Sequence, residues 1–329
     1  MKTEDSATPS GTIAVGPAAG GPARAPVPDA AGGAPGSRSA GRSGTLLAGL
    51  GVVAFSLTFP STAWGLESFG PWSLVALRSL LAAVIAGSVL LVTRVRVPER
   101  RHWAGLAVVA GGVVVGFPLL TTLALQTSTT SHAAVVVGLL PLTTAVFASV
   151  RTGARQSRTF WIAAVAGAGV VIVFTVLQSG GALSAGDLCL FGALLVCAAG
   201  YTEGGRLAKV MPGWQVIGWA LILTLPLAVA GTALALPYEP VRLTAHGVTG
   251  LVWVAACSTF FGLYVWYRGM AEIGVARASQ LQLAQPLLTL VWSYFLLGEG
   301  VSAAAPVAAV AVLLCIVATQ RTGGAGRGR

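Results

Sequence analysis

Apolar residues in this chain gather into long runs, separated by short breaks that carry Gly, Pro or charged residues. A helix needs about 20 apolar residues to cross a bilayer, and each run is long enough for one. The runs lack the strict apolar and polar alternation that the strands of a membrane barrel show. The pattern predicts ten membrane-spanning helices, near residues 45–65, 71–93, 103–123, 132–150, 159–177, 186–205, 214–236, 247–267, 278–297 and 302–319.

Composition agrees with an all-α integral membrane protein. Of 329 residues, 55% are hydrophobic and only 9% are charged, against about 25% charged in soluble domains, and the mean hydropathy is +0.81. The four cysteines lie inside apolar runs without metal-ligand spacing, so we interpret them as packing residues and expect neither a metal nor a cofactor. They are Cys189, Cys197, Cys257 and Cys315.

Charged residues predict how the chain lies in the membrane. The formal net charge is +10, but the basic residues do not form one patch, so nucleic acid is not an expected partner. With ten spans both tails lie on one side, and that side carries eleven loop Lys and Arg residues against Arg242 alone on the other. The positive-inside rule then places both tails in the cytoplasm. Residues 1–43, rich in Gly, Pro and Ala and without the apolar core of a signal peptide, are expected to be a disordered tail, and residues 321–329 a second tail.

The chain also contains an internal repeat. A shift of 145 residues aligns residues 105–153 with 250–298 without a gap, and Pro141 then matches Pro286. The halves 44–178 and 179–320 therefore each hold five spans, and because five is odd they must cross the membrane in opposite directions. The expected fold is two inverted five-helix repeats, which is typical of secondary transporters that alternate access to a central site.

The ninth span carries a family resemblance. The stretch Pro286–Glu299, PLLTLVWSYFLLGE, is similar to the proline-led ninth helix of EamA-type exporters in the drug/metabolite transporter superfamily. Its counterpart Pro141–Ala154, PLTTAVFASVRTGA, keeps the proline but ends in Ala where the family usually has Glu, and Pro71 followed by Arg78 is a second similar feature. The resemblance implies a ten-helix bundle in the inner membrane, with a cavity between its halves, that moves small metabolites such as amino acids outward.

Proline and polar residues inside the spans are the candidates for a binding site. A proline cannot bond to the carbonyl four residues earlier, so Pro118, Pro141 and Pro286 each free one backbone oxygen; the alternative is a simple packing kink. The amides of Gln282 and Gln285 face either a substrate or a partner helix. Aromatic residues near them form either a cavity wall or an interfacial belt. The substrate-binding candidates are Gln282, Gln285, Tyr264, Phe260, Trp292 and Tyr201.

Two charged residues inside spans suggest coupling or charge sensing. Glu203 is the only acid that the pattern places within a span, as a proton-coupling group or, on the favoured interpretation, as a partner of Arg206 near the helix end. Arg78 either attracts an anionic substrate group or, as favoured, pairs with Glu67 and backbone carbonyls. Glu299 is expected to be a solvated loop residue.

The predicted function is a secondary transporter that exports a small organic metabolite, such as an amino-acid-like compound or a drug, by alternating access. No Walker pattern is present for ATP hydrolysis. A membrane receptor or scaffold remains an alternative, and an intramembrane enzyme is less favoured, because the sequence has no HExxH motif and its histidines fall near span ends. The expected partners are a small-molecule substrate and the lipid bilayer, and a homodimer is left open.

Overall fold

A computed structural model describes residues 35–153, 156–178, 183–273 and 281–325, and every regular element within those ranges is helical. The first half contains α1 (Pro35–Ser56), α2 (Thr58–Ser68), α3 (Pro71–Val92), η1 (Arg100–His102), α4 (Trp103–Val109), η2 (Ala110–Gly116), α5 (Phe117–Ala124), α6 (Thr130–Val137), α7 (Leu140–Thr152) and α8 (Arg158–Gln178). The second half contains α9 (Ala185–Leu207), α10 (Gly213–Ala235), α11 (Ala245–Val252), η3 (Trp253–Gly262), α12 (Leu263–Ile273), α14 (Gln285–Leu297) and α15 (Ala304–Ala325).

The helices confirm the prediction of a ten-span membrane protein. Within the described ranges, eight helical stretches are long and apolar enough to cross a bilayer, and two shorter apolar helices, Gln285–Leu297 and Ala304–Ala318, occupy the ninth and tenth positions. α1 begins at Pro35, inside the range 1–43 that the sequence analysis assigns to a tail, and residues 1–34 lie outside the described part of the chain. α15 ends at Ala325, inside the second assigned tail, 321–329.

The two halves repeat each other in detail. α7 and α14 each have 13 residues, and each ends at a glycine in the left-handed conformation, Gly153 with φ 66° and Gly298 with φ 63°. Only glycine adopts this conformation without steric cost, so the two glycines end the helices at the same place. The third span of each half contains a wide π-type helix, η2 in the first and η3 in the second. These shared irregularities support the repeat that the sequence predicts.

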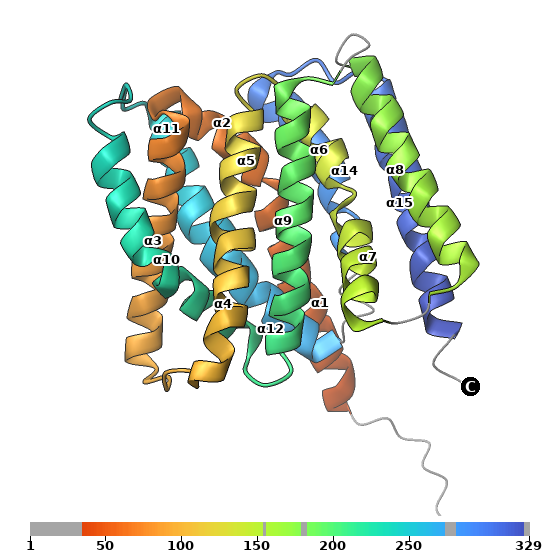
Figure 1. Ribbon diagram of the computed structural model, residues 1–329, viewed down its shortest axis with the longest axis horizontal. Helices are drawn as coiled ribbons and strands as arrows, with labels where there is room; N and C mark the ends of the chain where they lie inside the picture. Colours follow the sequence, from red (N-terminus) through yellow and green to blue (C-terminus); the bar gives the residue numbers. More distant parts are fainter. Residues whose placement is uncertain (1–34, 154–155, 179–182, 274–280, 326–329) are drawn as a thin grey trace, which may run out of the picture.

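Helices from opposite halves pack side by side (Figure 1). α3 lies against α10, α8 against α15, α1 against α12 and α2 against α11. The described ends of the chain lie at the lower side of Figure 1, together with the loops that follow α3 and α9. The second span therefore packs on the seventh and the fifth on the tenth, as two interlocked repeats require.

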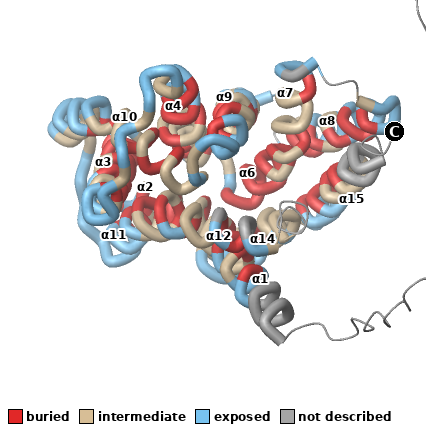
Figure 2. Tube along the Cα trace, turned by 90° about the horizontal axis from the view of Figure 1, so that it is seen from below, coloured by how far each residue is buried: buried red, intermediate tan, exposed pale blue. Residues whose placement is uncertain are grey.

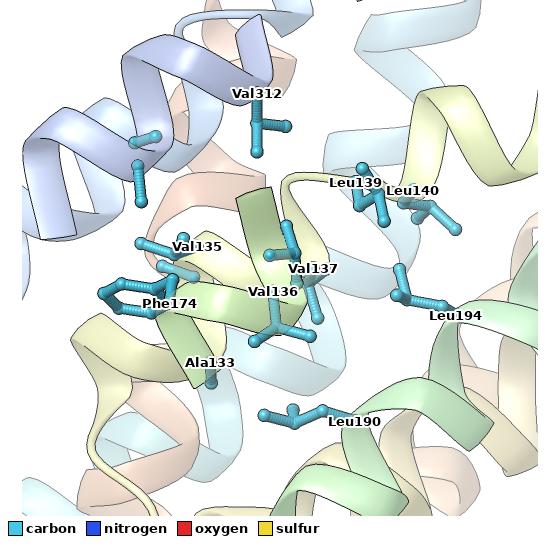
Figure 3. Packing of buried hydrophobic residues seen from close by; sticks show 14 of the residues in the cluster. Ala133, Val135, Val136, Val137, Leu139, Leu140, Phe174, Leu190, Leu194 and Val312 are labelled. Atoms are coloured by element: carbon cyan, nitrogen blue, oxygen red, sulfur yellow. The ribbon is translucent and has the colours of Figure 1, made fainter. Parts of the chain in front are cut away.

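How far a helix is buried depends on its place in the bundle and not on an amphipathic pattern along the helix (Figure 2). All eight residues of α6 are buried, and Figure 3 shows Val135, Val136 and Val137 packed among Phe174, Leu190 and Leu194. Outward-facing apolar residues on the peripheral helices are exposed, for example Val165 and Leu314, as expected for contact with lipid. α6 is thus the buried centre of the bundle, surrounded by longer lipid-facing helices.

Candidate substrate cavity

A cavity of about 360 Å³ lies between the two repeats. Residues from both halves line it, including the broken fourth and ninth spans and the wide helices η2 and η3. Its volume falls in the range of small-molecule sites, and its position between repeats is where transporters of this architecture bind substrate. The cavity is therefore the candidate site.

The fourth and ninth spans are each broken into two short helices beside the cavity. α6 ends at Val137, a turn at Gly138 and Leu139 follows, and α7 then begins with Leu140. In the ninth span Leu283 and Ala284 form the turn before α14, and residues 274–280 lie outside the described ranges. Pro141 and Pro286 each occupy the second position of the new helix, where a missing backbone N–H costs nothing.

This arrangement corrects the expectation of continuous, kinked helices at these two prolines. The turns use backbone bonds of their own, from the N–H of Leu139 to the oxygen of Val136 and from the N–H of Ala284 to the oxygen of Leu281. Both prolines and Pro118 line the cavity, and Pro118 lies at the start of α5, after the π-type helix η2. Gln282 and Gln285 also line it, although the turn between them means that they do not share one helix face.

Arg78 is the one charged residue among the described residues that line the cavity. The residue is only 7% exposed, and its Nη2 donates a hydrogen bond to Oγ1 of Thr259 at 3.0 Å. The expected pairing with Glu67 is not formed. Arg78 bonds to Thr259 of η3 instead, and the carboxylate oxygen Oε2 of Glu67 lies 3.7 Å from Nδ1 of His246. A cationic group therefore lies inside the cavity wall without an acidic partner among the described residues.

Hydroxyl groups complete the polar part of the lining. Ser258 and Thr58 form a hydrogen bond of 2.6 Å across the two halves, and Thr289 donates to the backbone oxygen of Ser56 at 2.8 Å. Thr144, the counterpart of Thr289 in the first repeat, has a buried hydroxyl without a hydrogen-bond partner among the described residues. Tyr201 of α9 also lines the cavity.

Three predicted aromatic contacts lie outside the cavity lining. Phe260 is 4% exposed and belongs to a separate apolar cluster. Tyr264 packs edge-to-face on Trp214, with ring centroids 6.3 Å apart. Trp292 donates from Nε1 to Oγ of Ser56 at 2.9 Å. These three rings therefore pack against neighbouring helices and do not line the cavity.

Glu203 is also absent from the cavity lining. Its carboxylate accepts hydrogen bonds from Nε of Arg206 at 3.0 and 3.1 Å, as the i,i+3 spacing predicts. Arg151 at the end of α7 approaches the same carboxylate at 3.8 Å. Glu203 thus links the ends of α7 and α9, away from the cavity.

Two acidic residues have roles that the sequence analysis missed. Asp187 is fully buried in α9, and its Oδ1 lies 2.7 Å from Nε2 of His132 in α6, so Glu203 is not the only acid within a span. Glu299 is not a free loop residue, because its carboxylate accepts backbone N–H bonds from Thr130 and Ser131. Each had a sequence signal: Ser184 followed three residues later by an acid is a helix-capping pattern, and Glu299 ends the stretch that carries the family resemblance.

Comparisons with known proteins agree with this architecture. The EamA-like transporter family matches residues 42–176 and 184–319, one match for each repeat. The uncharacterized transporter YdeK of Bacillus subtilis (strain 168) is 42% identical over 275 residues, which cover 83% of this chain and 95% of YdeK. A crystal structure with 20% sequence identity superimposes with a TM-score of 0.61 over 85% of this chain and 98% of its own, which supports the fold.

Two repeats around a central cavity define a membrane transporter rather than an enzyme. The chain belongs to the EamA-like transporter family.

Proposed function

We propose that this transporter exports a small organic metabolite across the inner membrane by alternating access, and that the cavity between its repeats is the substrate site. The observation that carries the proposal is the pair of broken helices, one in each repeat, whose second halves begin at the cavity wall. Broken helices of this kind place backbone groups and helix ends around substrates in the middle of a membrane.

The orientation follows from the loop charges. The end of the bundle that holds both described chain ends also carries the Arg-rich loop after α3 and the loop after α9, which contains Lys209. The opposite, acidic end has Glu67 near the end of α2, Glu239 beside the start of α3 and Glu299 beside the start of α6. Under the positive-inside rule the Arg-rich end faces the cytoplasm.

Contacts at the two ends of the bundle suggest how access alternates. At the acidic end Glu299, after α14, binds the start of α6; at the basic end Glu203 of α9 lies 3.8 Å from Arg151 of α7. If the contacts at one end broke while those at the other end held, the cavity would open to one side of the membrane at a time. Alternating access by two repeats of opposite orientation requires such a change.

Transport by the purified full chain in liposomes tests the proposal. A panel of labelled metabolites is loaded on one side, with and without a pH gradient, and movement is compared for the wild type and Gln285→Ala. Gln285 lines the cavity, so its variant should slow transport, whereas Gln215→Ala, an amide on α10 outside the lining, should not. Equal transport by both variants would remove the cavity from the pathway, and a folded protein that moves no compound would favour a receptor.

A further inference from the structure

We infer that the cavity selects an organic monocarboxylate with an apolar or aromatic body, and that Arg78 binds its carboxylate. This inference rests on the proposed function, because it assigns the substrate class of the same site. It replaces the expectation of an amino-acid-like substrate with a carboxylic acid that lacks the amino group.

The charge of Arg78 is the first step. The guanidinium has five N–H donors, and Thr259 is its one hydrogen-bond partner among the described residues. A buried charge is costly unless it is paired and hydrogen-bonded. Two acidic residues at the acidic end of the bundle, Glu239 and Glu67, have other partners. Glu239 accepts the backbone N–H groups of Trp72 and Ser73, and Glu67 lies beside His246. A ligand anion would supply the missing partner.

Thr259 fixes where that charge lies. Its hydroxyl donates to the backbone oxygen of Val254, five residues earlier in the wide helix η3, at 2.6 Å. With its proton used there, the oxygen accepts from Nη2 of Arg78 at 3.0 Å. Arg78 thus comes from the first repeat, but its guanidinium is held at the wall formed by the second.

The second repeat presents more polar side chains to the cavity than the first repeat does at the matching positions. Eight pairs of positions related by the 145-residue repeat line the cavity, and in four of them the first repeat supplies an aliphatic side chain where the second supplies a polar one. These four pairs are Val113 and Ser258, Val114 and Thr259, Val137 and Gln282, and Leu140 and Gln285. The four polar members form a polar wall, which favours one orientation for a ligand with one apolar and one polar end.

The start of α14 strengthens the preference for an anion at the polar wall. Gln285 is the first residue of this helix, and both it and Pro286 line the cavity. The N-terminus of a helix carries a partial positive charge, which adds to that of Arg78. Phe59 and Phe117 offer aromatic surface for the body of the ligand.

The same lining disfavours an ammonium group. No Asp or Glu is among the described residues of the cavity wall, so the ammonium of an amino acid or an amine would be desolvated without a carboxylate partner. A carboxylic acid without the amino group should therefore bind more tightly than the amino acid with the same carbon skeleton.

Binding of four related probes to the purified full chain in detergent tests the inference. The probes are 3-phenylpropionate, L-phenylalanine, 2-phenylethylamine and the neutral 3-phenylpropanamide, measured by titration calorimetry. We expect 3-phenylpropionate to bind at least about tenfold more tightly than phenylalanine or the amine, because each unpaired buried charge costs at least that factor. Arg78→Gln should lose about 10- to 100-fold in affinity for the carboxylate, while affinity for the amide changes little.

Two further variants keep the test valid if Arg78→Gln fails to fold. Arg78→Lys keeps the charge but not the forked donor geometry, and Thr259→Val removes the hydrogen bond that orients Arg78. Both should weaken carboxylate binding less than Arg78→Gln does. Arg96→Gln, which removes an exposed arginine in the loop after α3, is the matched control and should leave binding unchanged.

The outcomes separate this inference from the proposed function. Equal affinity for the anion and the amine, no binding of 3-phenylpropionate, or unchanged carboxylate binding in all the Arg78 and Thr259 variants would overturn the anion site. Transport of phenylalanine in liposomes without preference for 3-phenylpropionate would support the transporter and overturn the inference. Arg78-dependent carboxylate binding without movement of any probe would keep the site and contradict transport.

Discussion

Ser131 donates both its backbone N–H and its hydroxyl to one carboxylate oxygen of Glu299, at 3.0 and 2.9 Å, although 168 residues separate them in the sequence. The other carboxylate oxygen accepts the N–H of Thr130 at 2.8 Å. The first N–H groups of a helix have no partner within the helix, and a carboxylate is favoured there by the helix dipole. Glu299 therefore ties the end of α14 to the buried start of α6.

Replacing Glu299 should loosen this end of the bundle. Glu299→Ala leaves several donors of α6 unpaired, so we expect the free energy of unfolding to fall by about 1–2 kcal/mol, measured by thermal unfolding of the purified protein in detergent. Glu67→Ala, at the same end and with only a 3.7 Å contact to His246, serves as the control. Equal melting temperatures for the two variants would mean that the Glu299 contacts do not stabilise the fold.

The glycines that end α7 and α14 should resist substitution. Gly153→Ala and Gly298→Ala would force a side chain into the left-handed conformation at φ 66° and 63°, at a cost of about 1 kcal/mol each. Gly169→Ala on α8 is the matched control, since the glycine lies within a helix and an added Cβ meets open space. The same unfolding measurement should show lower stability for the first two variants only, and a loss in Gly169→Ala of equal size would contradict the backbone explanation.

The buried pair of His132 and Asp187 should matter more than a surface ion pair. Asp187 also accepts the backbone N–H of Ser184 at 2.8 Å, so Asp187→Ala removes both a helix cap and the partner of His132. We expect a loss of about 2–4 kcal/mol in the free energy of unfolding, again by thermal unfolding. Asp187→Asn keeps an acceptor for the cap and should lose less. Glu99→Ala, which breaks the exposed contact with Arg101, should have little effect; a comparable loss there would argue against the importance of burial.

Glu203 should stabilise the bundle rather than couple transport to protons. Because its carboxylate is paired with Arg206 and does not line the cavity, Glu203→Gln should leave ligand affinity unchanged and keep any pH dependence of transport. Liposome assays with and without a pH gradient check this expectation. Loss of the pH dependence in this variant alone would instead make Glu203 the coupling group.

The sequence by itself determined the number of spans and the repeat. Whether a segment enters the membrane depends on the hydrophobicity of that segment alone, and the shared prolines and glycines of the two halves mark where the chain must break or end a helix. For this reason Pro141, Pro286 and two glutamines of the ninth span, Gln282 and Gln285, could be singled out before the cavity was known.

Only the tertiary structure decided which side chains meet. Arg78 reaches Thr259 across 181 residues and Glu299 reaches Ser131 across 168, and hydrophobic periodicity carries no information about such pairs. Periodicity also places Phe260 and Trp292 on helix faces, but which neighbour each face meets depends on how whole helices pack. The local chemistry of the chain therefore fixed its helices, whereas the packing of the two repeats against each other decided which of their polar groups surround the cavity.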